Sequence, residues 1–272
     1  MNQLKKGTSS VFFVWVIALV ALPLAGLVAG CSTGPELNKQ PQTAQVALDV
    51  RFAEGKKAYE KGQYLDAIKI FEDIRVQSPT SEVAAEATYL EGLSRFQEEM
   101  YSGAAVDFRA LRRNYPKDPL ASRAQYMIGE SYFRLSPRPE LDQTYSSYSI
   151  GEFQTFLRDY PGAAPTLIDS AQKRIADVRN KLAQKVFLAG ELYLKMQENK
   201  AALVFYDRLL DQYYDSQYAP EAQLRIAEIQ LSRHRMAESR DAILKFDSKY
   251  LESATQAQRQ RARSVKDDLP NP

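Results

Sequence analysis

The sequence has one cysteine and one histidine among 272 residues, and this scarcity excludes several kinds of site. A disulfide needs two cysteines, and a zinc site usually draws several ligands from His and Cys, so neither can form within one chain. The sequence also lacks a glycine-rich phosphate loop, a serine nucleophile elbow and a paired-histidine motif. We therefore expect no enzymatic activity, no metal and no cofactor.

An excess of charge of either sign is also missing. The chain has 36 Lys and Arg against 34 Asp and Glu, and without Lys5 and Lys6, which lie in a segment expected to be removed, 34 of each sign remain. A neutral mature chain argues against nucleic acid as a partner. With 44% hydrophobic and 26% charged residues, the composition is that of a globular protein.

Residues 1–30 have the features of an export signal. A short basic start is followed by an uncharged apolar run over 11–28, and Ala29 and Gly30 then precede Cys31. This boundary resembles the lipobox of bacterial lipoproteins, in which the cysteine is diacylated and becomes the first residue after cleavage. Cys31 is therefore the predicted lipid attachment site.

Two other interpretations of this segment stay open, namely an uncleaved membrane helix and a plain secretory signal with an incidental cysteine. Pro23 and Gly26 interrupt a spanning helix and so favour the lipobox. Residues 31–46 are polar and contain two prolines, which predicts a flexible tether. Acyl chains on Cys31 would hold the body on a membrane, at roughly 0.8 kcal/mol per buried CH₂ group.

Internal self-similarity is the strongest signal in the rest of the chain. Gly55, Gly92 and Gly129 are 37 residues apart. In the first two units a small residue follows the glycine by 12 positions, an aromatic residue by 16 and a proline by 24. This spacing matches the tetratricopeptide repeat, so the sequence predicts an all-α solenoid of about five helix-turn-helix units.

The residue types at these positions have physical reasons. Gly55 and Ala67 are small, so the two helices of a pair can approach closely there. Phe71 is expected to fill the space between neighbouring pairs, and Pro79 to end the second helix. The segment 61–64 supplies the turn between the helices.

The period also divides the chain. Residues 47–165 would hold repeats 1–3, with about eight extra residues at 136–143 between the helices of the third unit. Residues 166–253 would hold repeats 4 and 5 together with one long linking helix over 167–197, where apolar residues recur every three to four positions. The polar tail 254–272 is expected to fray.

The last two units are less regular than the first ones. The fourth keeps Gly190, Ala202 and Tyr206, whereas the degenerate fifth has Ser239 as its small residue. His234 falls near the turn of the fifth unit, where a turn or surface histidine is the expected interpretation.

Aromatic residues also recur at the 37-residue spacing and form two ladders on the first helices of units 1–3. These positions lie at or near the concave surface in tetratricopeptide proteins, so they are candidates for a peptide-binding groove with rigid aromatic anchors. The alternative is that each ring is simply buried against the next unit. The candidates are Phe52, Tyr89 and Tyr126 in one ladder, and Tyr59, Phe96 and Phe133 in the other.

The segment 135–145, which reads LSPRPELDQTY, and the segment GEFQTFLRDYP at 151–161 carry a more specific resemblance. Together with the lipobox and five repeats, they make the chain look like the outer-membrane assembly lipoprotein BamD (ComL/YfiO-like) family, closest to its Bacteroidetes-type members. The loop residues that carry the match are Arg138, Asp142, Gln143 and Thr144. Ser147 and Ser149 depart from the family, which more often has Lys and Ala there.

The resemblance implies a lipoprotein subunit of the β-barrel assembly machinery, or BAM complex, anchored in the outer membrane and facing the periplasm. Its implied partners are a BamA-like barrel protein, contacted through POTRA domains, and unfolded outer-membrane protein clients, while Cys31 would engage the lipid. Ser32 follows Cys31, and by resemblance to enterobacterial sorting this favours the outer membrane. The alternatives are another tetratricopeptide lipoprotein, such as a secretin pilotin or a cell-envelope scaffold, and a glycan-binding lipoprotein.

Overall fold

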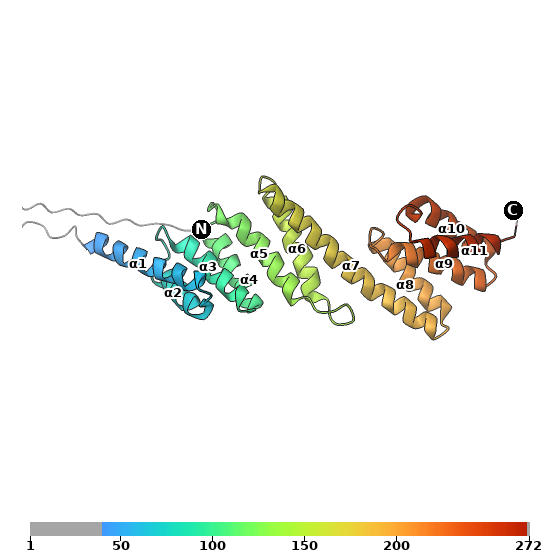
Figure 1. Cartoon of the computed structure of the whole chain (residues 1–272), viewed down its shortest axis with the longest axis horizontal. Helices are drawn as coiled ribbons and strands as arrows, with labels where there is room; N and C mark the ends of the chain where they lie inside the picture. The colour runs from blue at the N-terminus through green and yellow to red at the C-terminus, as the bar shows by residue number, and fades with distance from the viewer. Residues whose placement is uncertain (1–39, 271–272) are drawn as a thin grey trace, which may run out of the picture. The chain divides into compact units, whose positions relative to one another are not determined.

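A computed structural model describes residues 40–270, so the predicted signal peptide 1–30 and Cys31 lie outside the described residues. Residues from Thr43 onward form one compact unit. Over 40–270 the chain folds into eleven α-helices without a strand (Figure 1), which confirms the all-α prediction. The helices are α1 Gln40–Glu60, α2 Tyr64–Gln77, α3 Ala84–Gln97, α4 Tyr101–Asn114, α5 Leu120–Leu135, α6 Thr144–Asp159, α7 Pro165–Lys195, α8 Asn199–Gln212, α9 Ala219–Ser232, α10 Met236–Tyr250 and α11 Gln256–Asp267.

Consecutive helices pack against each other as hairpins. The pairs α3–α4 and α5–α6 form units 2 and 3, and α1 with α2 forms unit 1. The helix predicted over 167–197 is α7, whose 31 residues span about 46 Å at 1.5 Å per residue. It packs on α6 and on α8, while α9 and α10 form the fifth unit.

Each of four units is built on a contact between a glycine and an aromatic ring. A Cβ atom added to any of these glycines would lie 2.7 or 2.8 Å from a ring carbon, closer than atoms can approach without displacement. The ring therefore fills a hollow within its own helix pair, whereas we expected it to fill the space between pairs. The contacts are Gly55 with Phe71, Gly92 with Phe108, Gly129 with Phe153 and Gly190 with Tyr206.

The small residues of units 3 and 5 add hydrogen bonds between the paired helices. Ser149 Oγ donates to the carbonyl oxygen of Gly129 at 3.0 Å, so the departure from the family at this position leaves the packing intact. Ser239 Oγ likewise donates to the carbonyl oxygen of Ala227 at 2.9 Å. Ala227 takes the glycine position of unit 5, and the aromatic position sixteen residues later holds the smaller Ile243.

The turn inside four of the five units uses one residue with left-handed backbone geometry. Gly62 has a φ of 75°, and the corresponding Glu99, Gln197 and His234 have φ values of 59°, 60° and 57°. His234 is thus an exposed turn residue, as its sequence context indicated. Unit 3 is the exception, because the inserted loop replaces this turn.

The C-terminal segment differs from expectation. Residues predicted to fray form α11, which packs on α9 and α10. Its start is fixed by a capping box, in which Thr255 Oγ1 accepts from the backbone N–H of Gln258 and the Gln258 side chain accepts from the backbone N–H of Thr255. Only Ala262 and Val265 of α11 are buried, and most of its other residues are polar or charged.

Candidate protein-interaction surface

The first aromatic ladder packs inside the helix pairs. Phe52 is buried, with 8% of its surface exposed, while Tyr89 and Tyr126 are half-buried. The ring centroids are 5.9 Å apart between Phe52 and Phe71, 5.6 Å between Tyr89 and Phe108, and 5.3 Å between Tyr126 and Phe153. These ring contacts lie within one unit, and a role of this ladder in peptide binding stays a prediction.

The second ladder lies at the turn end of the same helices, and its three rings are half-buried. Tyr59 meets Tyr64 edge-on at 5.5 Å, and Phe96 meets Tyr101 at 5.0 Å. Phe133 lies under the guanidinium of Arg174, 4.3 Å from its central carbon to the ring centroid. Each ring has a partner within the chain and keeps part of its surface open, so a role in peptide binding stays a prediction.

The inserted loop of unit 3 is organised around the buried side chain of Gln143. Its Nε2 donates to the backbone carbonyls of Arg138, Pro139 and Leu141 at 2.9, 3.3 and 3.1 Å. Its Oε1 accepts from Ser146 Oγ at 2.6 Å. A single amide therefore satisfies the inward carbonyls and holds the loop in one conformation.

Two lysines of α7 attach this loop to the long helix. Lys181 Nζ donates to Ser136 Oγ at 2.8 Å, and Lys185 Nζ donates to the carbonyl oxygen of Leu141 at 2.7 Å. Burial lowers the pKa of Lys181. At the other end of the loop, Asp142 Oδ1 accepts from the backbone N–H of Thr144, the first residue of α6, at 2.9 Å.

The loop and the start of α6 expose apolar side chains in one region. Leu141 is 49% exposed, Tyr145 40% and Tyr148 53%, and Arg138 is exposed as well. The ring centroid of Tyr132 on α5 lies 6.0 Å from that of Tyr145 and 5.5 Å from that of Tyr148. We call Tyr132, Tyr145 and Tyr148 the tyrosine cluster.

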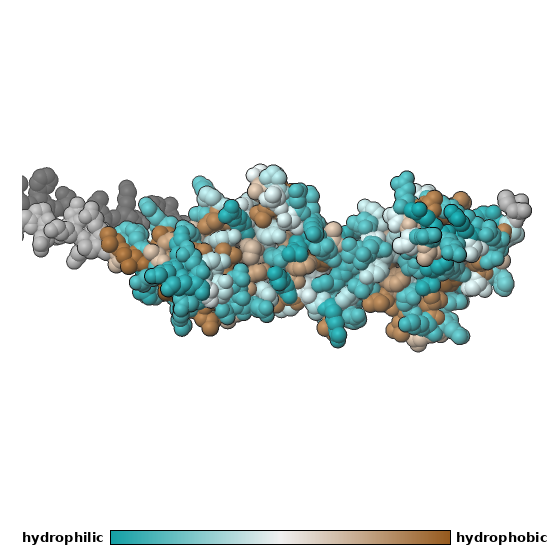
Figure 2. Space-filling model, viewed as in Figure 1, coloured by the Kyte–Doolittle hydropathy of each residue, from teal (hydrophilic) through white to brown (hydrophobic). Residues whose placement is uncertain are grey.

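The tyrosine cluster was missed by sequence reasoning. Its members fall outside the 37-residue ladders, and the insertion places Tyr145 and Tyr148 beside Tyr132. Arg109 fixes the inner ring, because its Nη1 donates to the Tyr132 hydroxyl at 2.7 Å and its Nη2 lies 2.5 Å from a carboxylate oxygen of Glu152. Exposed aromatics held in place in this way are typical anchors of protein interfaces. On the face in Figure 2, hydrophobic residues are scattered over a mainly hydrophilic surface.

A recurring Glu–Arg pair joins the first helices of successive units. The glutamate directly follows the glycine position of its unit, and the arginine comes from the first helix of the next unit. The shortest distances are 2.8 Å for Glu130 with Arg174, 3.0 Å for Glu191 with Arg225, and 2.8 Å for Glu228 with Arg261. The last pair links α9 to α11, so α11 occupies the place of the first helix of a sixth, incomplete unit.

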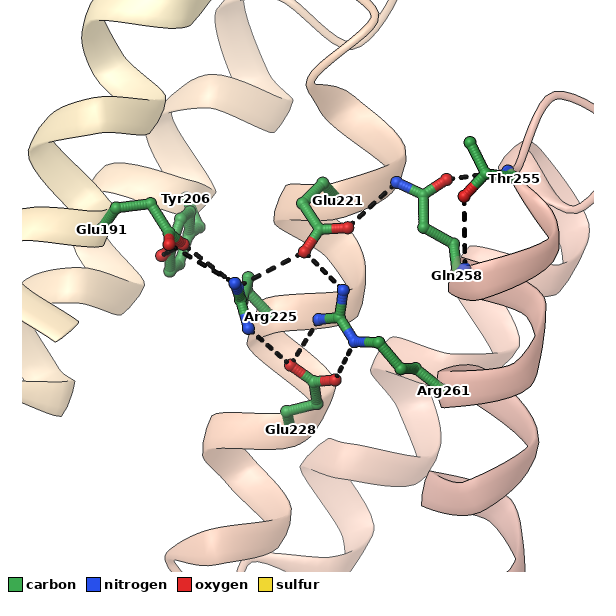
Figure 3. Close-up of polar contacts among 8 residues, drawn as sticks. All are labelled: Glu191, Tyr206, Glu221, Arg225, Glu228, Thr255, Gln258 and Arg261. Carbon is green, nitrogen blue, oxygen red and sulfur yellow. Dashed lines mark hydrogen bonds and ion pairs between the residues drawn. The ribbon is translucent and has the colours of Figure 1, made fainter. Parts of the chain in front are cut away.

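Figure 3 shows the hydrogen bonds and ion pairs that connect the helices at this end of the solenoid. Arg225 reaches Glu191 of α7 and Glu228 of its own helix, and Arg261 reaches Glu228 and Glu221. The hydroxyl of Tyr206 also donates to Glu191 Oε1 at 2.6 Å. The network makes repeats 4 and 5 and α11 one bonded unit.

Between units 1 and 2, Asp107 of α4 is buried in a second charged cluster. The carboxylate of Glu91 forms two ion pairs, with Oε2 2.7 Å from Arg75 Nε and Oε1 2.6 Å from Arg95 Nη2. Arg95 Nε in turn lies 2.7 Å from Asp107 Oδ2. Burial, together with the negative charge of Glu91, raises the pKa of Asp107 to about 7 and outweighs the opposing effect of Arg95 and Arg75.

This raised pKa predicts a stability that changes with pH. Between about pH 4 and pH 7 the folded protein binds more protons than the unfolded chain, so the free energy of unfolding falls as the pH rises through this range. Asp107→Asn keeps the shape and removes the charge, so it should raise the urea midpoint at pH 8 and flatten the pH profile. Asp66→Asn, at an exposed residue, is the matched control. A lower midpoint for Asp107→Asn at pH 8 would show that pairing with Arg95 outweighs burial.

Neither a membrane-spanning helix nor a metal site is found in the part of the chain that the structure describes. No helix over 40–270 is long and apolar enough to cross a bilayer. No group of His, Cys, Asp and Glu in the same range could hold a metal ion.

The comparison that decides the family is a match of residues 45–213 to the family model YfiO, described as outer membrane lipoprotein. The chain belongs to this family. The match runs from α1 to the residue after α8 and so includes the inserted loop and the long helix. No curated protein matches the chain.

Three solved structures, two of them described as TPR domains or proteins, are similar to this member of the YfiO family. The TPR2AB domain of yeast Sti1 in its complex with pHSP90 is 15% identical, with a TM-score of 0.38, over 83% of this chain and 98% of that one. A thermophilic TPR protein of Thermus thermophilus, TTC0263, is 17% identical, with a TM-score of 0.33, over 80% and 98%. Pseudomonas aeruginosa pilF is 13% identical, with a TM-score of 0.32, over 83% and 91%. Similarities this low support no functional inference.

Proposed function

We propose that this lipoprotein is the periplasm-facing adaptor of the β-barrel assembly machinery and takes part in inserting β-barrel proteins into the outer membrane. Membership of an outer membrane lipoprotein family, matched over 45–213, is the observation that carries the proposal. The solenoid supplies surfaces for protein partners, and no bond-making step belongs to the proposed role. The proposed partners are a BamA-like barrel protein with POTRA domains and unfolded outer-membrane clients.

The inserted loop and the tyrosine cluster are the surface that we assign to a protein partner. The loop is held by Gln143 from within and by Lys181 and Lys185 from α7, so little conformational freedom is lost when a partner binds. Tyr145 and Tyr148 present large exposed rings beside it. Rigid aromatic anchors on a fixed scaffold are the arrangement that gives high affinity for a small contact area.

Copurification of the full-length chain from detergent-solubilised membranes tests this function. Recovery of a barrel protein with POTRA repeats would support the proposal, whereas recovery of a secretin without such a protein would favour a pilotin and contradict it. The double variant Tyr145→Ala/Tyr148→Ala should reduce recovery of the barrel protein roughly tenfold, because both anchors are removed. Tyr214→Ala removes an equally exposed tyrosine from another surface and should leave recovery unchanged.

The lipid anchor is a separate prediction. We expect metabolic labelling with palmitate to mark the protein and Cys31→Ala to lose both the label and the association with membranes, since the sequence has a single cysteine to acylate. Fractionation of cells that carry each form measures this. Continued labelling of Cys31→Ala would contradict the lipobox interpretation.

A further inference from the structure

A cavity of about 900 Å³ lies in the C-terminal half, far in sequence from the inserted loop. It opens where the α8–α9 turn, the end of α10 and the start of α11 come together against α7. Its lining includes Asn180, Tyr214, Ser216, Tyr250, Ser253 and Thr255. Neutral hydroxyl, amide and phenol groups make up most of this set, and Asp215 and Lys249 add one charge of each sign.

Several polar side chains of the wall are already oriented by hydrogen bonds within the protein. Asn180 accepts from the backbone N–H of Gln217 at 2.9 Å, Ser253 donates to the carbonyl oxygen of Tyr250 at 3.1 Å, and Thr255 accepts from the backbone N–H of Gln258 at 3.3 Å. A hydroxyl or an amide has more than one hydrogen-bonding position, so each of these groups keeps capacity for a ligand. The wall therefore offers fixed donors and acceptors together.

Tyr214 adds an apolar surface at the same site. Its side chain is 64% exposed, so its ring face is open to a ligand bound in the cavity. Asp215 is neutralised by Arg179, with Nη2 2.6 Å from its carboxylate, so the lining has no excess of negative charge. A sugar ring matches this combination. It can stack on the flat face of a tyrosine, and the hydroxyls around its edge both donate and accept hydrogen bonds. We infer that this cavity binds a neutral saccharide.

Saturation-transfer NMR on the full-length chain tests the proposal with maltotriose and chitotriose as neutral probes and galacturonic acid trimer as an anionic one. The full-length chain should be kept in micelles of a zwitterionic detergent, because the sugar headgroup of a glycoside detergent would compete with the saccharide probes. We expect a neutral trisaccharide to bind in preference to the anionic one, and Tyr214→Ala to weaken it about tenfold. Tyr148→Ala, at an exposed tyrosine of the other surface, is the matched control and should bind normally.

Absence of binding by both neutral probes at about 10 mM, or binding that survives Tyr214→Ala at full strength, would overturn the proposal. So would competition for the cavity by a peptide but not by a saccharide. Copurification of the barrel protein is independent of these outcomes, so the proposed adaptor role and the saccharide site can fail separately.

Discussion

Gly92→Ala is expected to destabilise the protein by roughly 2–3 kcal/mol, although alanine is the better helix former, because the core at this point has no room for a methyl group. The added Cβ would lie 2.8 Å from Cε1 of Phe108, and that ring is fully buried between α3 and α4. Urea unfolding followed by circular dichroism measures the effect.

Gly151→Ala is the matched control within the same fold. Gly151 lies in α6 with no atom within 4 Å of an added Cβ, so alanine there should stabilise the helix by up to about 1 kcal/mol. The same substitution thus has opposite expected signs at two helical glycines. A destabilisation at Gly151 as large as that at Gly92 would mean that the loss comes from the backbone and not from the Phe108 contact.

The fifth unit provides a compensating change. It has Ala227 at the glycine position and Ile243 where the other units have a ring. The double variant Gly92→Ala/Phe108→Ile copies this pair into unit 2, and it should lose less stability than the sum of the two single variants. Strict additivity would contradict a direct contact between these positions.

The regular part of this fold is predictable because a single period determines it. The sixteen-residue spacing between Gly55 and Phe71 identifies two residues that touch, and in unit 3 the eight inserted residues carry the partner of Gly129 to Phe153, where the structure has it. The insertion was visible in the sequence as a break in the period. The conformation of the insertion was not visible, because it depends on one buried amide, Gln143, and on two lysines of α7 that bond to loop residues 45 and 44 positions earlier in the chain.

The features that were missed involve polar or irregularly spaced residues. Helix α11 buries only Ala262 and Val265 and is rich in Gln and Arg, so it lacks the many large apolar residues that mark the helices of the repeats. The signal that could have found it is the glutamate that follows the glycine position in units 3–5, since Glu191 and Glu228 have an arginine 34 and 33 residues later, respectively. The tyrosine cluster combines residues from α5 and α6 whose proximity depends on the loop between them.

The attachment of α11 to α9 is expected to depend on the Glu228–Arg261 pair. Arg261 Nε and Nη2 each lie 2.8 Å from a carboxylate oxygen of Glu228, and Nη1 lies 2.7 Å from Glu221 (Figure 3). Hydrogen bonds to Glu228 and then Glu221 raise the pKa of Arg261 despite its burial, so the guanidinium is always charged. Burial opposes ionisation of Glu221, but hydrogen bonds from Gln258 and Arg261 outweigh it and lower its pKa.

Arg261→Met should release α11 from α9 while the rest of the solenoid stays folded. Methionine keeps the apolar stem of the side chain and removes the guanidinium, which leaves Glu221 and Glu228 close together with only Arg225 as an ion-pair partner. The two small buried residues of α11 cannot compensate for this loss. Hydrogen exchange of the α11 amides should accelerate by roughly a hundredfold, whereas Lys266→Met, which removes an exposed pair with Asp247, should change it little. The pKa of Glu221 in the folded protein lies below its ordinary value of 4.5, so the ionised carboxylate stabilises the folded state at pH values above that. Acidification below pH 4.5 should therefore weaken the attachment of α11 in the wild-type protein as well. Unchanged protection of α11 in Arg261→Met would show that its apolar contacts with α9 and α10 are sufficient to hold it.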